Sequence, residues 1–152
     1  MEPQDRSAVA KAIVDANRYM TLGTADETGL PWVSPVWYAP AAYRELYWVS
    51  SPEARHSRNI AVRPQMSIVI FDSNAPVGSG QGVYMSAVAK EVAASGLDRG
   101  MEIFSQRSQQ QGARPWTTED VQPPASLRLY HAVVSEHFVL SPGDERLPVS
   151  ID

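Results

Sequence analysis

The segment ELYWVSSPEARHSRNIAVRPQMSIVIF, residues 45–71, decides the fold. An alternating run that ends at Ser51 predicts a strand, the sequence Ser-Ser-Pro predicts a turn, and residues 53–62 have the pattern of a short helix. Pro64 disfavours helix at the residue before it. The run QMSIVIFD at residues 65–72 predicts the next strand. The centre of the chain therefore reads as strand, turn, short helix, strand.

Hydroxyl and basic side chains gather where this short helix begins. Ser50 and Ser51 precede it, and Arg55, His56 and Arg58 follow within its first turns. Free backbone N–H groups at a helix start, together with hydroxyls and guanidinium groups, favour the binding of a phosphate. The same spacing also fits the solvated face of a surface helix on which His56 is an ordinary surface residue. Spacing alone leaves both interpretations open.

Composition limits the classes of protein to which the chain can belong. Its 152 residues predict a single domain, 1–152, that buries enough surface to fold without disulfides or metals. The net charge of −4 argues against a general role on nucleic acid or a membrane surface. The absence of cysteine excludes disulfides, thiolate metal sites and a cysteine nucleophile. No apolar run is long enough for a membrane span and no signal peptide opens the chain, so a cytoplasmic location is expected.

The remaining segments predict a small barrel made mainly of β-strands. A helix is expected at residues 6–17, the barrel at 19–140, with a helix at 97–111 inside it, and a loosely held tail at 141–152. Strands are predicted at residues 19–25, 31–39, 45–51, 65–72, 81–94 and 127–140. Pro35 removes a ladder donor and marks its strand as an edge strand or a bulged one. Six strands joined mainly by short turns favour an antiparallel barrel over a parallel sheet.

The ordered set of segments resembles the pyridoxamine 5′-phosphate oxidase-like family, the FMN-binding split barrel. The resemblance rests on ARHSRNI, QMSIVIF, GQGVYMSAVAKEV and RLYHAVVSEHFVL, and extends from about Tyr19 to Leu140. It implies a mainly β fold with inserted helices, a six-stranded antiparallel Greek-key split β-barrel. It also implies a homodimer that holds FMN at the subunit interface and acts on a small-molecule substrate.

The resemblance assigns the cofactor-binding positions residue by residue. The family's phosphate-binding basic pair corresponds to Arg55 and His56, where His56 replaces the usual lysine, and Arg58 lies one turn further along the helix. Ser34 stands where the oxidase itself has an arginine. The expected cofactor-binding residues are Val36, Trp37, Tyr38, Val49, Ser50, Arg55, His56, Arg58 and Gln81.

The substrate side departs from the oxidase. Ala39 stands where a lysine is expected, and the family's arginine and histidine pair appears as Arg128 with Tyr130. Pyridoxamine or pyridoxine phosphate is therefore not the expected substrate. The leading hypothesis is an FMN-dependent oxidoreductase, in which the flavin carries the hydride chemistry and no side chain is needed as a nucleophile. The alternatives are a deazaflavin-dependent reductase, a non-catalytic flavin or haem carrier, and a structural dimer without cofactor.

Two further patterns have simpler structural explanations. His131 and His137 lie an even number of residues apart on one strand, and hence on one face unless a bulge intervenes. They are interpreted as structural residues, and no metal site is predicted. The aromatic residues Trp32 and Trp48 are expected to fill the barrel or the dimer seam. For Trp37 and Tyr38 the choice between that role and stacking on a cofactor ring stays open.

Overall fold

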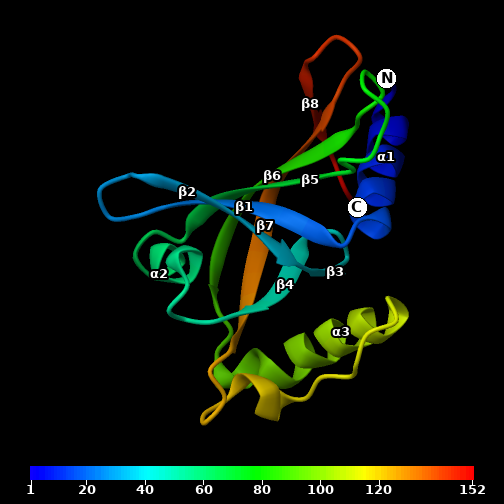
Figure 1. The fold of residues 1–152 in the computed structure, drawn as a ribbon. Helices are drawn as coiled ribbons and strands as arrows, with labels where there is room; N and C mark the ends of the chain where they lie inside the picture. Colours follow the sequence, from blue (N-terminus) through cyan, green and yellow to red (C-terminus); the bar gives the residue numbers. More distant parts are fainter.

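Eight strands form one curled antiparallel sheet in a computed structural model that describes residues 1–152 (Figure 1). The strands are β1 Tyr19–Ala25, β2 Pro31–Trp37, β3 Ala39–Ala41, β4 Glu45–Ser50, β5 Gln65–Phe71, β6 Gly82–Glu91, β7 Arg128–Leu140 and β8 Arg146–Val149. The helices are α1 Pro3–Ala16, α2 Arg55–Val62 and α3 Leu97–Gln110, with 3₁₀ turns at Ala94–Gly96 and Thr118–Val121. The predicted split-barrel fold class is confirmed.

The sheet closes into a barrel because its two edge strands follow one another in the chain. The strand order is β2-β1-β5-β6-β7-β4-β3, and β2 and β3 are joined only by Tyr38. The Tyr38 hydroxyl donates to the carbonyls of Val14 at 2.6 Å and Asn17 at 3.0 Å, which ties the junction to the end of α1. The strand expected at 31–39 is therefore divided at Tyr38. Pro35 lies on an edge strand, as expected, where its missing N–H costs no ladder bond.

Alternating side chains fill the barrel interior. In β5, Met66, Ile68 and Ile70 point inward and are buried, while the residues between them face outward. Trp48 of β4 is the largest fully buried side chain, and its ring stacks on that of Tyr130 with centroids 5.8 Å apart. The expectation that Trp48 fills the barrel is confirmed.

A second, smaller core joins α3 to the outer face of the barrel. Met101 and Phe104 of α3 pack against Tyr47 of β4 and Leu129 of β7. Gly100 makes this close approach possible, since a Cβ at that position would lie 2.8 Å from side-chain atoms of both Tyr47 and Leu129. β4 is therefore covered on both faces, by the barrel core inside and by α3 outside (Figure 1).

The two other helices lie at opposite ends of the barrel. α1 packs beside β8 and the start of β6, whereas α2 contacts β1, β2 and β6 and inserts Ile60 into the barrel core (Figure 1). None of the three α-helices combines the length and the apolar character that a bilayer crossing requires.

The C-terminal segment is held firmly, so the expectation of a loose tail at 141–152 was wrong. β8 pairs with β7, Ile151 is only 3% exposed within the main core, and its carbonyl accepts hydrogen bonds from the Arg44 guanidinium. The sequence pattern missed this segment because four residues of strand and one apolar anchor are too short to give a periodic signal.

Candidate functional site

Five of the nine expected site residues line one pocket of about 510 Å³. Its walls come from β2, β4, α2, α3 and the connection that follows α3. The expected residues in the lining are Val36, Trp37, Val49, Ser50 and His56. Most of the lining is apolar, with Ser50, His56 and Ser108 as its polar members. An apolar cavity of this size with a few polar groups is typical of a site for a small organic ligand.

His56 is fixed by two serine hydroxyls. Its Nδ1 lies 3.0 Å from Ser34 Oγ on β2, and its Nε2 lies 2.9 Å from Ser50 Oγ on β4. The side chain is 8% exposed, so the alternative of an ordinary surface histidine is wrong. Burial lowers the pKa of His56 below its ordinary value, because desolvation disfavours the imidazolium. His56 is therefore neutral near pH 7 and does not serve as the cation that replaces the family's lysine.

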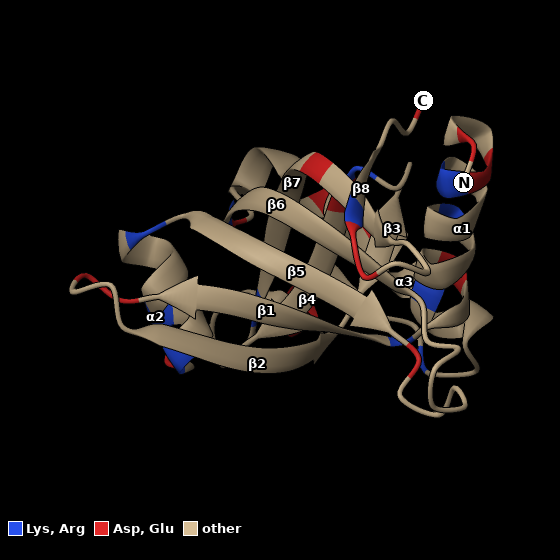
Figure 2. Ribbon diagram, turned by 90° about the horizontal axis from the view of Figure 1, so that it is seen from above, with Lys and Arg blue, Asp and Glu red and all other residues tan.

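Positive charge at this site comes instead from Arg55 and Arg58. Both residues are exposed on α2, and neither forms a salt bridge. With Trp32, Asn59 and neighbouring residues of the β1–β2 turn they line a second pocket of about 340 Å³. Figure 2 shows the basic side of α2 beside the acidic turn that contains Asp26 and Glu27.

Tyr38 and Gln81 lie apart from the other expected residues. The Tyr38 side chain is buried in the core, where desolvation raises the pKa of its phenol, and it lines neither pocket. Gln81 is exposed and directly precedes β6, whose first residue pairs with Phe71. α2 instead leads into Gln65 at the other end of β5. Within one subunit Gln81 is thus at the far end of the sheet from α2.

Sequence reasoning missed the wall supplied by α3 and the segment after it. Phe104, Trp116 and Leu127 line the larger pocket. Phe104 makes edge-to-face contacts with Trp37 at 4.8 Å and with Trp116 at 5.2 Å, while Trp37 Nε1 donates to Gln111 Oε1 at 2.6 Å. The helical spacing predicted α3, but no local pattern shows which sheet face a helix will cover.

A bulge separates the two histidines of β7. The pairing with β6 shifts between Ser86 and Ala87, which leaves Ser135 as the extra residue. His137 is buried and its Nε2 lies 2.7 Å from the Tyr43 carbonyl, while His131 lies 2.9 Å from Glu45 on the opposite face. The two imidazoles therefore do not form a pair that holds one ligand.

The residues expected on the substrate side also lie apart from one another. Arg128 donates to the carbonyls of Ala125 and Leu127 in its own loop, whereas Tyr130 points into the barrel core. Ala39 is buried against α3. These three positions therefore do not come together around one basic pocket, and the expectation about the substrate stays a prediction.

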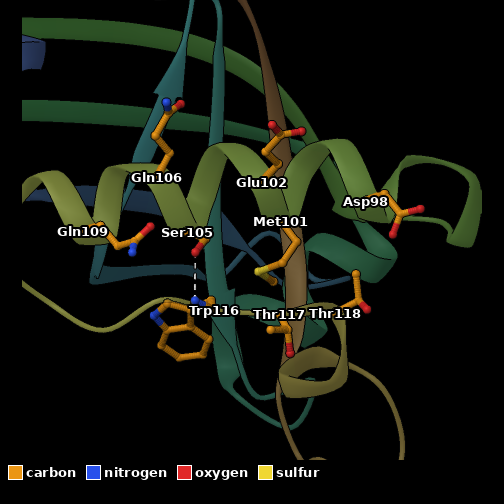
Figure 3. A pocket seen from close by; sticks show the side chains of 9 residues that line it. All are labelled: Asp98, Met101, Glu102, Ser105, Gln106, Gln109, Trp116, Thr117 and Thr118. Atoms are coloured by element: carbon orange, nitrogen blue, oxygen red, sulfur yellow. Dashed lines mark hydrogen bonds between the residues drawn. The ribbon is translucent and has the colours of Figure 1, made fainter.

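A third hollow, of about 470 Å³, lies on the outer side of α3 and contains none of the expected residues (Figure 3). Asp98, Glu102 and Gln109 line it, and the backbone N–H of Trp116 donates to Ser105 Oγ at 2.8 Å. It is open and polar, and although α3 contributes to both, Trp116 is the one lining residue that it shares with the expected site.

Comparison with known proteins identifies the family. The family model described as pyridoxamine 5′-phosphate oxidase matches residues 7–136. The chain belongs to this family. Among curated proteins, none is significantly similar to it in sequence. The oxidase family thus includes this chain although Ser34, Ala39 and His56 depart from the oxidase's own pattern.

Solved structures share the fold at low sequence identity. A haem-binding protein from Mycobacterium smegmatis has a TM-score of 0.75 at 18% identity, over 95% of this chain and 57% of that one. HutZ, the haem storage protein of Vibrio cholerae, gives 0.67 at 21% identity, over 85% and 90% of the two chains. A candidate pyridoxamine 5′-phosphate oxidase from Listeria innocua gives 0.66 at 14% identity, over 88% and 97%. The chain thus spans little more than half of the M. smegmatis protein.

Proposed function

We propose that this chain binds FMN between β2, β4 and α2 and serves as a flavin-dependent oxidoreductase for a small molecule other than pyridoxamine phosphate. The observation that carries the proposal is the position of the two pockets. A pocket with two arginines that form no salt bridge and an apolar pocket of about 510 Å³ follow one another along β2, where Trp32 lines the first, residues 35–37 line the second and Ser34 lies between them in the sequence. A flavin has the same division, with a planar ring system at one end and a phosphate at the other.

The residues of the larger pocket fit a ring system. Val36, Val49 and Trp37 offer apolar contact, and Ser50 and Ser108 offer hydroxyls at its edge. Cavities of this size and polarity bury most of a drug-sized ligand. The bound flavin supplies the hydride chemistry, and the chain's own residues orient it and exclude water.

The residues of the smaller pocket fit the phosphate. Arg55 and Arg58 are free to form charge-assisted hydrogen bonds with an anion. The N-cap residue Ala54 offers no side-chain hydrogen bond, so the first N–H groups of α2 keep their capacity to donate. The acidic turn at Asp26 and Glu27 repels a phosphate placed deep in this pocket. We therefore expect the phosphate nearer to Arg55 and the start of α2.

A second copy of the chain completes the proposed site. Tyr19, Val33 and Phe71 leave at least half of their side-chain surfaces exposed on the outer face of the barrel. An apolar surface of this kind favours contact with a partner. Because Gln81 lies at the far end of the sheet from α2 within one subunit, its expected contact with the cofactor also requires a second subunit. Sedimentation velocity would test the dimer independently of the cofactor.

A non-catalytic haem carrier is the second candidate. It is favoured by the haem-binding and haem storage proteins among the fold neighbours. The histidines argue against it within one subunit, because His56 is engaged through both nitrogens and His131 and His137 each through Nε2. A deazaflavin-dependent reductase stays open, since the same pocket accepts a related ring.

One titration separates these functions. Cofactor-free protein is titrated with FMN, riboflavin, a deazaflavin and haemin, and binding is followed by fluorescence and absorbance. The proposal expects FMN to bind at least tenfold more tightly than riboflavin, because only FMN carries the phosphate. It also expects reduction of bound FMN by a nicotinamide donor. Preference for haemin or the deazaflavin, or no binding of FMN, would overturn it.

A further inference from the structure

The donor and acceptor roles in the two hydrogen bonds of His56 depend on the tautomer of its imidazole. A neutral imidazole has one N–H group and one bare nitrogen, and both of its nitrogens here face a serine hydroxyl. One serine therefore accepts a hydrogen bond from His56 and the other donates one to it. Desolvation favours the neutral ring, so the two hydrogen bonds run in opposite directions, whereas an imidazolium would donate to both serines.

Two arrangements satisfy this geometry. In the first, Ser34 donates to Nδ1, and Nε2–H donates to Ser50, whose own O–H is then free to point into the larger pocket. In the second, Ser50 donates to Nε2, and Nδ1–H donates to Ser34, whose O–H is then free to point toward solvent. The same heavy-atom positions serve both arrangements, since hydroxyl hydrogens rotate.

Ser34, His56 and Ser50 form a hydrogen-bonded row that leads from outside the pocket to its lining. Ser50 and His56 line the pocket, whereas Ser34 does not line it and is only partly buried on the edge strand β2. We propose that Ser34, His56 and Ser50 form a proton relay that exchanges protons between solvent and a redox group in the pocket. This proposal rests on the proposed function for its ligand, and its hydrogen-bond geometry stands without it.

The proton balance follows from the two arrangements. Starting from the first, Ser50 Oγ gives its proton to the ligand and receives the proton of His56 Nε2. Nδ1 then takes the proton of Ser34 Oγ, which takes one from water. One proton has passed inward, no residue has changed charge, and the second arrangement remains. When the ligand gives up a proton, the same steps run backward and restore the first arrangement. A cofactor that gains a proton on reduction and loses one on oxidation therefore returns the three residues to their starting state in each cycle.

The tautomer of His56 tests the relay without any cofactor. The ring nitrogens of ¹⁵N-histidine-labelled protein are observed by NMR at pH 7.5, and the His56 signals are assigned with the variant His56→Gln. The relay expects both His56 nitrogens to show shifts between those of a protonated and a bare nitrogen. Ser34→Ala and Ser50→Ala should each fix a single tautomer. A single tautomer in the unchanged protein, or tautomer populations that neither variant alters, would overturn the relay.

A kinetic measurement tests whether the relay carries protons to and from bound FMN. FMN-loaded protein is reduced with dithionite and reoxidised with ferricyanide in a stopped-flow instrument. We expect Ser34→Ala to slow reoxidation by about 10- to 100-fold while the FMN dissociation constant changes less than about twofold. Ser73→Ala, in the exposed loop before β6, serves as the control and should leave the rate unchanged. An unchanged rate in Ser34→Ala would contradict the relay. Failure to bind FMN would contradict the proposed function and leave the NMR test of the relay in force.

Discussion

The guanidinium carbon of Arg55 lies 4.2 Å from the centre of the Trp32 ring. This cation–π contact links the start of α2 to the edge strand β2, although the Trp32 side chain is 41% exposed. It holds a flexible side chain near one position before any ligand arrives. An anion that binds Arg55 thus loses less side-chain entropy than it would with a free arginine.

Arg55→Ala is predicted to weaken FMN binding by about 1.5 to 3 kcal/mol, because a charge-assisted hydrogen bond to the phosphate is lost. Trp32→Leu should give a smaller loss, since the cation remains but is no longer held. Isothermal titration calorimetry measures both. Arg6→Ala, on α1 at the opposite end of the barrel from α2, is the control. Equal losses in the Arg55 and Arg6 variants would rule out a specific phosphate contact.

Gly100→Ala is predicted to destabilise the protein by about 1 to 3 kcal/mol. The new Cβ would lie 2.8 Å from atoms of Tyr47 and Leu129, both nearly fully buried, and the gain in helix propensity offsets only part of this overlap. Urea unfolding gives the free energy. At Gly96 the same substitution meets only Val92, at 3.5 Å, and should change stability little. A more stable Gly100→Ala protein would mean that α3 packs less closely than described.

Ile151→Ala is predicted to cost about 2 to 4 kcal/mol of unfolding free energy, as for other large-to-small changes in a packed core. Ile151 joins the main core although it lies beyond the last strand. The neighbouring Ser150 is exposed, and Ser150→Ala should stay within about 0.5 kcal/mol of the unchanged protein. Thermal and urea unfolding of the pair would show whether the C-terminal segment is anchored.

Acidification is predicted to destabilise the fold through its buried histidines. Burial lowers the pKa of His137 below the ordinary 6.5, and His56 shifts in the same direction for the same reason. The unfolded chain therefore binds these protons more readily than the folded protein does. The contribution of the neutral histidines to the free energy of unfolding is fully present above pH 6.5, the unfolded pKa. It is lost as the pH falls through that value toward the folded pKa, with a slope of up to about 1.4 kcal/mol per pH unit for each group.

Urea unfolding between pH 5 and pH 8 checks this dependence. His137→Gln keeps a donor for the Tyr43 carbonyl but has no titrating group, so its stability should fall less steeply with acidification. Identical slopes in the two proteins would show that His137 does not contribute.

Sequence patterns predicted most of the fold because alternation and turn residues act locally. The strands around α2 and the edge position of Pro35 follow from such patterns. What they could not predict depends on contacts between distant segments. Examples are the division of the second strand at Tyr38, which closes the barrel, and the anchoring of Ile151 by Arg44.

The candidate site was predictable in part for the same reason. The resemblance predicted that Ser50 and His56 bind the cofactor, and both residues line the same pocket. It placed His56 in the basic pair that binds the phosphate, whereas burial lowers the pKa of this histidine and favours the neutral ring. The wall formed by Phe104 and Trp116 depends on how α3 docks, and α3 docks closely only because Gly100 has no side chain. No pattern within a single segment carries that information.

The extra residue Ser135 in β7 decides on which side of the sheet each histidine lies. A strand has a repeat of two, so residues six positions apart would share a side of a regular strand, and the bulge turns His131 and His137 to opposite sides instead. Deletion of Ser135 would remove the bulge but leave the imidazoles five regular positions apart, and hence still on opposite sides. A design that needs both imidazoles on one surface must instead give Ser135 a partner residue in β6.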